Sequence, residues 1–296
     1  MINKAFYFSS ILFLFFTSCS SEQDEMMNID ETLLAMNDDE FQNNKPKSKI
    51  VYSIPSPNEQ YDLLHSLTTA LIPTVINPLS NSLNYSTNSK KALNFGVYIS
   101  DVAYLMRYDQ GRSVFLDYVS TLEKLGQDLD ITKVYGEELI NQVDEEGTDT
   151  KRLFKISSEN YFSIYDQLIE NKKGLELSLI LSGSWIETMH ILFTSSKKYN
   201  ESAEVQGYII DQRLVLENLI GFVESFGEDE RIDPLMDYLR KIGNVYKKLK
   251  CEDSDLEIEN SEGTVMLTGG TSCKFTSNSY IEMKSLIMEI RTSIIS

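Results

Sequence analysis

Two carboxylic acids and a histidine lie well inside two long apolar stretches of this sequence. Glu187 and His190 are three positions apart between Leu175 and Phe193, and Asp101 lies between Ala92 and Met106. Both stretches are apolar nearly all round, which is typical of helices at the centre of a bundle. A carboxylate on a buried helix needs a partner or a proton, so these positions are the first candidates for chemistry.

The spacing of Glu187 and His190 also occurs in the carboxylate-bridged metal pairs of helical bundles. Such a site needs a second Glu-x-x-His, and His65 is the only other histidine of the chain. A single metal ion held by Asp101, Glu187 and His190 stays geometrically possible. We expect instead a buried hydrogen-bonded network with no metal, no cofactor and no catalytic residue, because buried charges are usually paired.

Glycines on the same two stretches predict that the helices cross closely. Gly96 and Gly183 each precede an aromatic residue by two positions, Tyr98 and Trp185. Glycine allows backbones to approach because it has no Cβ. Tyr98 and Trp185 are candidates for a binding surface, although large aromatic side chains at such positions more often belong to the core.

The other residue with a chemical signature is Cys19. The chain opens with Lys4 and an apolar run that ends at Phe16, too short for a membrane span but suited to a signal peptide. Thr17 and Ser18 precede the cysteine, and this resembles a bacterial lipobox. We therefore predict a lipoprotein signal peptide over residues 1–18 and a lipidated Cys19. The alternative is an ordinary signal peptide with an incidental cysteine.

Residues 19–50 read as an acidic, flexible tether. Eight acidic residues lie between Ser20 and Lys49, with little apolar sequence to support folding. The acidic run after the cysteine resembles the surface-export signals of Bacteroidetes lipoproteins, and a solvated spacer is the alternative. The expected location is the outer membrane, lipid-anchored and facing the periplasm or the cell surface.

Composition excludes several classes of function. The 296 residues include 45 acidic and 27 basic ones, so the formal net charge is −18. Nucleic-acid binding needs a basic surface, and so does electrostatic docking on anionic lipid. Three cysteines and two histidines also argue against zinc ribbons and disulfide-dense scaffolds.

The predicted fold class is all-α, with residues 51–249 forming a duplicated helical domain of two four-helix units, about 51–150 and 151–249. Residues 114–131 match residues 215–232 at five of eighteen positions without gaps, at an offset of 101. Unrelated segments share about one such identity.

The two glycine-bearing helices extend this match at a different offset. Gly96 and Gly183 align at an offset of 87, and a longer stretch around residues 197–207 restores the offset of 101. Compensating loop changes are typical of a diverged duplication. General similarity among helical sequences is the alternative.

Residues 250–296 depart from the helical pattern. Alternating residues and a turn around Asn260 predict a small β-hairpin, and a capping box at Ser279 predicts a final helix to about Ile295. Cys251 and Cys273 bracket the hairpin. In an exported protein they can form a disulfide, and two free thiols are the alternative.

Three short motifs lie along the helical domain. They are Ser53-Ile54-Pro55-Ser56-Pro57 followed by Glu59, Gly96-Val97-Tyr98 with Asp101, and Gly183-x-Trp185-Ile186-Glu187. Together they resemble an uncharacterised family of helical Bacteroidetes lipoproteins from about Val51 to the C-terminus. The resemblance implies a largely helical fold and brings no catalytic residues. His190 stands where that family usually has an aromatic residue.

These features favour a lipid-anchored envelope protein that acts as a non-enzymatic binding or scaffold module. Its expected partners are the membrane, through the N-terminal lipid, and an unknown protein, peptide or small molecule, but no nucleic acid. The alternative is a small-molecule or metal-dependent enzyme centred on Asp101, Glu187 and His190. A purely structural spacer is a third hypothesis.

Overall fold

The structure is a computed structural model. Every described residue belongs to one compact unit, Tyr52–Ser296. Cys19, the predicted signal peptide and the tether lie outside the described residues. Those that the structure describes are residues 54–58, 61, 71–108, 112–131, 150–195, 203–261 and 264–296.

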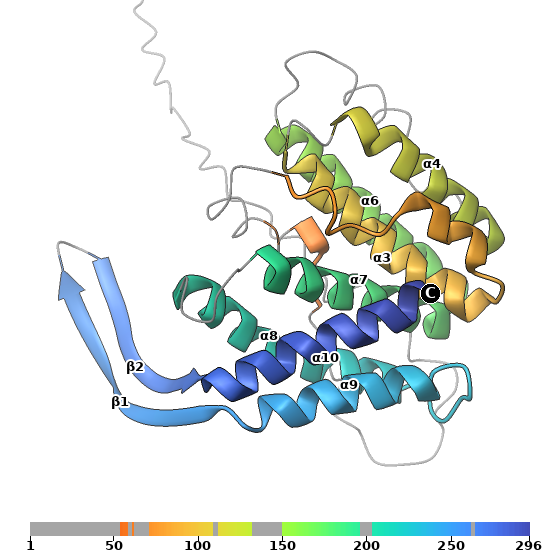
Figure 1. Cartoon of the computed structure of the whole chain (residues 1–296). Helices are drawn as coiled ribbons and strands as arrows, with labels where there is room; N and C mark the ends of the chain where they lie inside the picture. The colour runs from red at the N-terminus through yellow and green to blue at the C-terminus, as the bar shows by residue number, and fades with distance from the viewer. Residues whose placement is uncertain are drawn as a thin grey trace, which may run out of the picture. The chain divides into compact units, whose positions relative to one another are not determined.

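The described part of this unit is mainly helical, which confirms the predicted all-α class (Figure 1). A two-stranded hairpin precedes the last helix. In chain order the elements are η2 (Leu79–Asn84), α3 (Asn88–Met106), α4 (Arg112–Asp128), α6 (Thr150–Glu170), α7 (Gly174–Ser195), α8 (Ala203–Glu224), α9 (Asp233–Tyr246), β1 (Lys250–Ser261), β2 (Thr264–Lys274) and α10 (Ser277–Ile295).

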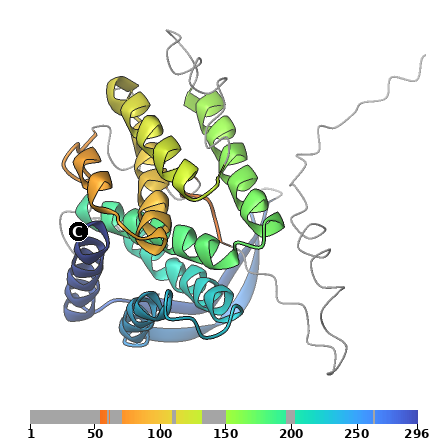
Figure 2. The same cartoon turned by 90° about the vertical axis from the view of Figure 1, so that its right-hand side faces the viewer.

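Helices α3 and α7 pack against each other at the centre of this fold. Helices α4 and α6 lie on one side of the pair, and α8, α9 and α10 lie on the other (Figures 1 and 2). Among the described helices, α7 alone is long and apolar enough to cross a membrane, but 89% of its most apolar window is buried inside the protein. This burial is what a core helix requires, since its neighbours cover its apolar surface on all sides.

The predicted close crossing is confirmed at Gly96 and Gly183. A Cβ atom at Gly96 would lie 1.9 Å from the carbonyl oxygen of Ile180, and one at Gly183 would lie 1.9 Å from that of Leu93. No side chain fits at such distances, because the obstructing atoms are backbone atoms. Both positions therefore require glycine.

The crossing is also reciprocal. Ile180 lies three residues before Gly183, and Leu93 lies three residues before Gly96. Each glycine thus contacts the same relative position on the other helix, as expected for two equivalent helices related by the offset of 87. The duplication itself stays a prediction, because residues 132–149, the last expected helix of the first unit, are outside the described part.

One helix end differs from the sequence prediction. The last helix begins about one turn early, with a capping box between Thr276 and Ser279. Gly227 follows α8 with φ +82°, a conformation that favours glycine at the end of a helix. After α4 the residue with a positive φ is Asp130, at 56°.

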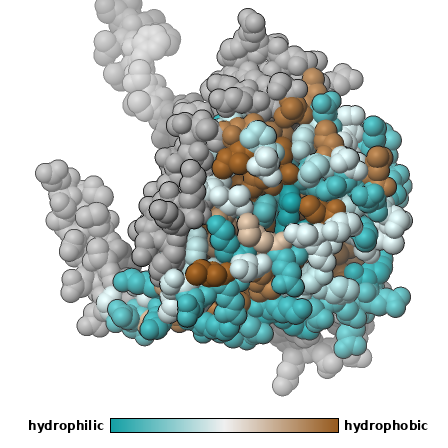
Figure 3. Space-filling view, viewed as in Figure 1, coloured by the Kyte–Doolittle hydropathy of each residue, from teal (hydrophilic) through white to brown (hydrophobic). Residues whose placement is uncertain are grey.

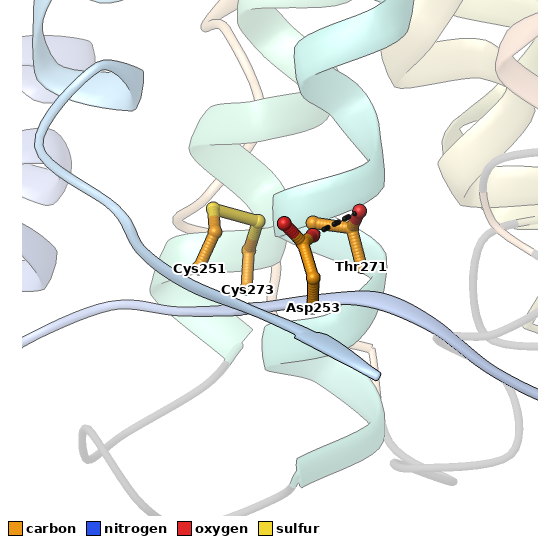
Figure 4. Close-up of a disulfide and its surroundings, with 4 residues drawn as sticks. All are labelled: Cys251, Asp253, Thr271 and Cys273. Atoms are coloured by element: carbon orange, nitrogen blue, oxygen red, sulfur yellow. Dashed lines mark hydrogen bonds between the residues drawn. A yellow bond between two sulfur atoms is a disulfide. The ribbon is translucent and has the colours of Figure 1, made fainter. Parts of the chain in front are cut away.

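The β-hairpin follows α9 and extends away from the helices (Figure 1). Its strands pair antiparallel, with Cys251 opposite Cys273. A disulfide joins these two residues, and next to it the Thr271 hydroxyl donates a hydrogen bond of 2.7 Å to Asp253 (Figure 4). An isolated two-stranded hairpin is marginally stable, so a covalent link at its base stabilises the pairing.

The glycine crossing predicts a strong effect of a single methyl group. Gly96→Ala and Gly183→Ala should each lower the free energy of unfolding by about 3 kcal/mol, because the helices must separate to admit a Cβ. Gly207→Ala on α8 is the matched control, since nothing lies within 4 Å of a Cβ there. The control should be neutral or stabilise by up to about 1 kcal/mol. Urea denaturation measures all three, and equal effects at the three sites would contradict the crossing.

Candidate functional site

A buried ion pair joins α7 to α10. The Glu187 carboxylate on α7 is 0% exposed. It accepts two hydrogen bonds from the Arg291 guanidinium on α10, from Nε to Oε2 and from Nη2 to Oε1, each 2.9 Å long. The same Nη2 donates to the carbonyl oxygen of Val75 at 3.2 Å. Paired geometry of this kind is the strongest that an arginine and a carboxylate form.

Asp101 on α3 brings a second carboxyl group to this pair. It is also 0% exposed, and its Oδ2 accepts a hydrogen bond of 3.1 Å from the backbone N–H of Asn77. Burial and the adjacent Glu187 carboxylate raise the pKa of Asp101 well above its ordinary value, although Arg291 and the Asn77 N–H act in the opposite direction. Its Oδ1 has no hydrogen-bond partner among the described atoms. The neighbouring Glu187 carboxylate favours the protonated form of Asp101, which can donate a hydrogen bond to it.

A second polar pair, formed by two uncharged hydroxyl groups, also joins α3 to α7. The hydroxyls of Ser100 and Thr188 are 2.8 Å apart, and the Tyr61 hydroxyl lies 2.6 Å from that of Ser100. The offset of 87 relates Ser100 to Glu187 and Asp101 to Thr188. The hydroxyl pair and the carboxyl pair are therefore equivalent positions of the two helices, one neutral and the other charged.

The segment before η2 is held over this centre by polar contacts. The Tyr118 hydroxyl donates to the backbone oxygen of Asn77 at 2.9 Å, and the Asn77 amide donates to the Tyr85 hydroxyl at 3.0 Å. The Tyr98 hydroxyl donates to the backbone oxygen of Pro78 at 2.9 Å. Tyr98, a candidate for a binding surface, thus faces the protein's own backbone.

The remaining candidates point elsewhere. Trp185 is 1% exposed, and its indole N–H donates to Gln212 on α8 at 2.9 Å. His190 is half-buried, and burial lowers its pKa, so the ring is neutral at pH 7. The structure brings Asp101 and Glu187 together, with His190 within electrostatic reach of Glu187.

Glu187, one of the three side chains considered as metal ligands, binds a guanidinium in this structure. Both oxygens of Glu187 bind the Arg291 guanidinium, which already neutralises its charge. In the part of the chain that the structure describes, no three His, Cys, Asp or Glu side chains group closely enough to hold a metal ion. The centre is chemically a structural ion pair with an added acid.

Sequence reasoning missed Arg291, although the chain carried a signal for it. Buried apolar residues of α10 include Met283, Ile287 and Ile294, which share one face of the helix. Arg291 lies on that face, four residues after Ile287. A lone arginine on the buried face of an apolar helix indicates a buried acidic partner. Asn77 left no such signal as a partner of Asp101, because it binds that carboxyl group through its backbone N–H.

An open pocket of about 470 Å³ lies between α8 and α9, away from the buried centre. Helix α8 contributes Arg213, Leu216, Glu217 and Ile220 to its lining. Helix α9 contributes Arg240, Gly243, Asn244 and Tyr246, and Lys247 lies directly after its end. We call it the α8–α9 pocket. In the view of Figure 3, the surface of the side that carries α9 and α10 is mostly hydrophilic.

Comparison with known proteins adds no family: no family model, curated protein or solved structure matches the chain.

The buried acid predicts a pH-dependent stability. The pKa of Asp101 is higher in the folded than in the unfolded state. Its contribution to the free energy of unfolding is therefore full below about pH 4 and is lost as the pH rises through its pKa in the folded state. Asp101→Asn keeps the shape of the neutral acid but cannot ionise. The free energy of unfolding of the wild type should fall relative to the variant by up to about 1.4 kcal/mol per pH unit within that window. Urea denaturation between pH 4 and pH 9 measures the difference, and parallel curves would contradict a raised pKa.

The ion pair predicts strong coupling between its partners. Arg291→Met leaves Glu187 buried without a counter-ion and should cost about 3–5 kcal/mol of stability. The double variant Arg291→Met/Glu187→Gln should cost clearly less than the sum of the two single variants. Arg240→Met is the control, since its pair with Glu224 is exposed and worth about 0–1 kcal/mol. Additive effects of Arg291 and Glu187 in urea denaturation would argue against the pair.

Proposed function

We propose that this protein is a lipid-anchored lipoprotein of a Gram-negative cell envelope that acts as a non-enzymatic binding module. Cys19 is its proposed lipid attachment site, and residues 19–50 are its proposed tether. The proposed location is the outer membrane. The signal-peptide pattern before Cys19 and the acidic run after it support both statements.

One observation carries the binding half of the proposal. The buried carboxyl groups that could do chemistry, Asp101 and Glu187, are both 0% exposed, and Glu187 is paired with Arg291. The α8–α9 pocket instead presents cationic and apolar groups to solvent. Cations around an apolar floor hold a ligand in place, which is what a binding module needs.

The anchor is tested by replacing Cys19 and the two disulfide cysteines in separate variants. Cells that express the full chain are fed an alkyne-tagged palmitate, and the protein is assayed for the label and for partition into the membrane fraction. Cys19→Ser should lose both. The control Cys251→Ser/Cys273→Ser keeps Cys19 and should retain both, because only the disulfide is removed. A label that persists in Cys19→Ser would overturn the anchor.

A further inference from the structure

We propose that the α8–α9 pocket binds a small organic anion: an oxyanion head group, carboxylate or phosphate, joined to an apolar body. The inference rests on the proposed binding function and names the chemistry of its ligand. It commits to a small molecule because a volume of about 470 Å³ lies in the range of small-molecule sites.

The two helices present matching faces to this pocket. The lining residues of α8 are at positions 213, 216, 217 and 220, which follow the spacing i, i+3, i+4, i+7 of one helix face. Those of α9 are at positions 240, 243, 244 and 246, and Lys247 follows directly after the helix. The pocket is thus built on two rigid elements, which hold lining side chains more accurately than loops do.

The helices run antiparallel, and this places two cations at one end of the pocket. Tyr246 donates a hydrogen bond to the backbone oxygen of Ile209 at 2.7 Å, and Arg240 contacts Glu224 at 3.3 Å. Residues early in α8 therefore lie beside residues late in α9. Arg213 and Lys247 fall at the same end, and the charge of Arg213 acts on Tyr246.

Arg213 is the cation with most to offer a ligand. Arg240 is paired with Glu224, and Lys247 donates to Asn244 at 3.2 Å. The Arg213 side chain is exposed, and its guanidinium makes no hydrogen bond or ion pair with any atom in the described ranges. A guanidinium binds a carboxylate or phosphate through two parallel hydrogen bonds.

The pocket is locally cationic, although the chain as a whole carries a negative net charge. Three cations and one carboxylate line the pocket of a protein whose net charge is −18. Long-range repulsion of anions falls off over about 8–10 Å at physiological salt, so a cationic cluster can still attract one at contact. An anion that binds here recognises this cluster and not the surface at large.

Gly243 provides the flat apolar floor. It lies in the last turn of α9, where alanine would be favoured by about 0.5–1 kcal/mol. A Cβ there would meet nothing nearer than the methyl carbons of Ile220 and Leu216, both at 4.0 Å. Packing of the protein does not require glycine at this position. A ligand body lying against the backbone of α9 beside Ile220 would favour glycine at this position.

Two dyes with the same aromatic core test the proposal on the mature chain. 8-Anilinonaphthalene-1-sulfonate carries one anionic head, and N-phenyl-1-naphthylamine is its uncharged counterpart. Fluorescence titration should give saturable binding of the sulfonate and clearly weaker binding of the neutral dye. Arg213→Met should weaken the sulfonate about tenfold or more, as loss of a charged hydrogen bond does, and should leave the neutral dye unchanged.

Two further variants test whether the dyes bind in the pocket. Lys124→Met on α4 removes one exposed positive charge away from the pocket and should leave binding of the sulfonate unchanged. Gly243→Leu fills the floor and should abolish binding of both dyes. Far-UV circular dichroism and urea denaturation of each variant show whether the fold is retained, and Arg213→Met is an exposed substitution that should not disturb it.

Displacement of the sulfonate identifies the source of the anion. Displacement by octanoate supports a lipid-derived carboxylate, and displacement by phenyl phosphate supports a phosphate ester. Acetate at the same concentration should displace neither, because it has no apolar body.

Three results would overturn the proposal: equal binding of the two dyes, unchanged sulfonate binding in Arg213→Met, or displacement by acetate as effective as by octanoate. Each leaves the lipid label on Cys19 untouched. Conversely, if the wild type carries no lipid label, the proposed anchor is wrong but the dye result is unaffected. The two proposals can therefore fail separately.

Discussion

The contact between the backbones of α3 and α7 is the constraint on which the other features depend. At Gly96 and Gly183 the two helices come so close that each glycine faces a carbonyl oxygen of the other. This distance sets Ser100 against Thr188 and Asp101 against Glu187. Had the helices been separated by ordinary side chains, neither polar pair would be within hydrogen-bonding reach.

The charged side of the crossing then determines where the last helix docks. An unpaired Glu187 inside the protein would be strongly unfavourable, and Arg291 relieves this only when α10 lies in one register. Apolar packing alone would tolerate small shifts of α10, since its buried face repeats along the helix. The ion pair contributes specificity of packing more than net stability, because desolvation of two charges offsets much of their attraction.

Much of this fold could be predicted from local sequence. The apolar character of the stretches around Gly96 and Gly183 indicated buried helices, and their glycines indicated a close crossing. The partner of Glu187 could not be found in this way, because Arg291 lies 104 positions further along and meets it only in the folded protein. The α8–α9 pocket was missed for a similar reason: each of its faces looks like an ordinary solvated helix surface, and only their antiparallel packing joins them.

The long separation of Glu187 from Arg291 has a consequence for the order in which the chain matures. Synthesis proceeds from the N-terminus, so α7 is made well before the residue that neutralises Glu187. During that interval a compact core would enclose a carboxylate without a counter-ion, which is unfavourable. Completion of the core therefore requires α10, which supplies Arg291.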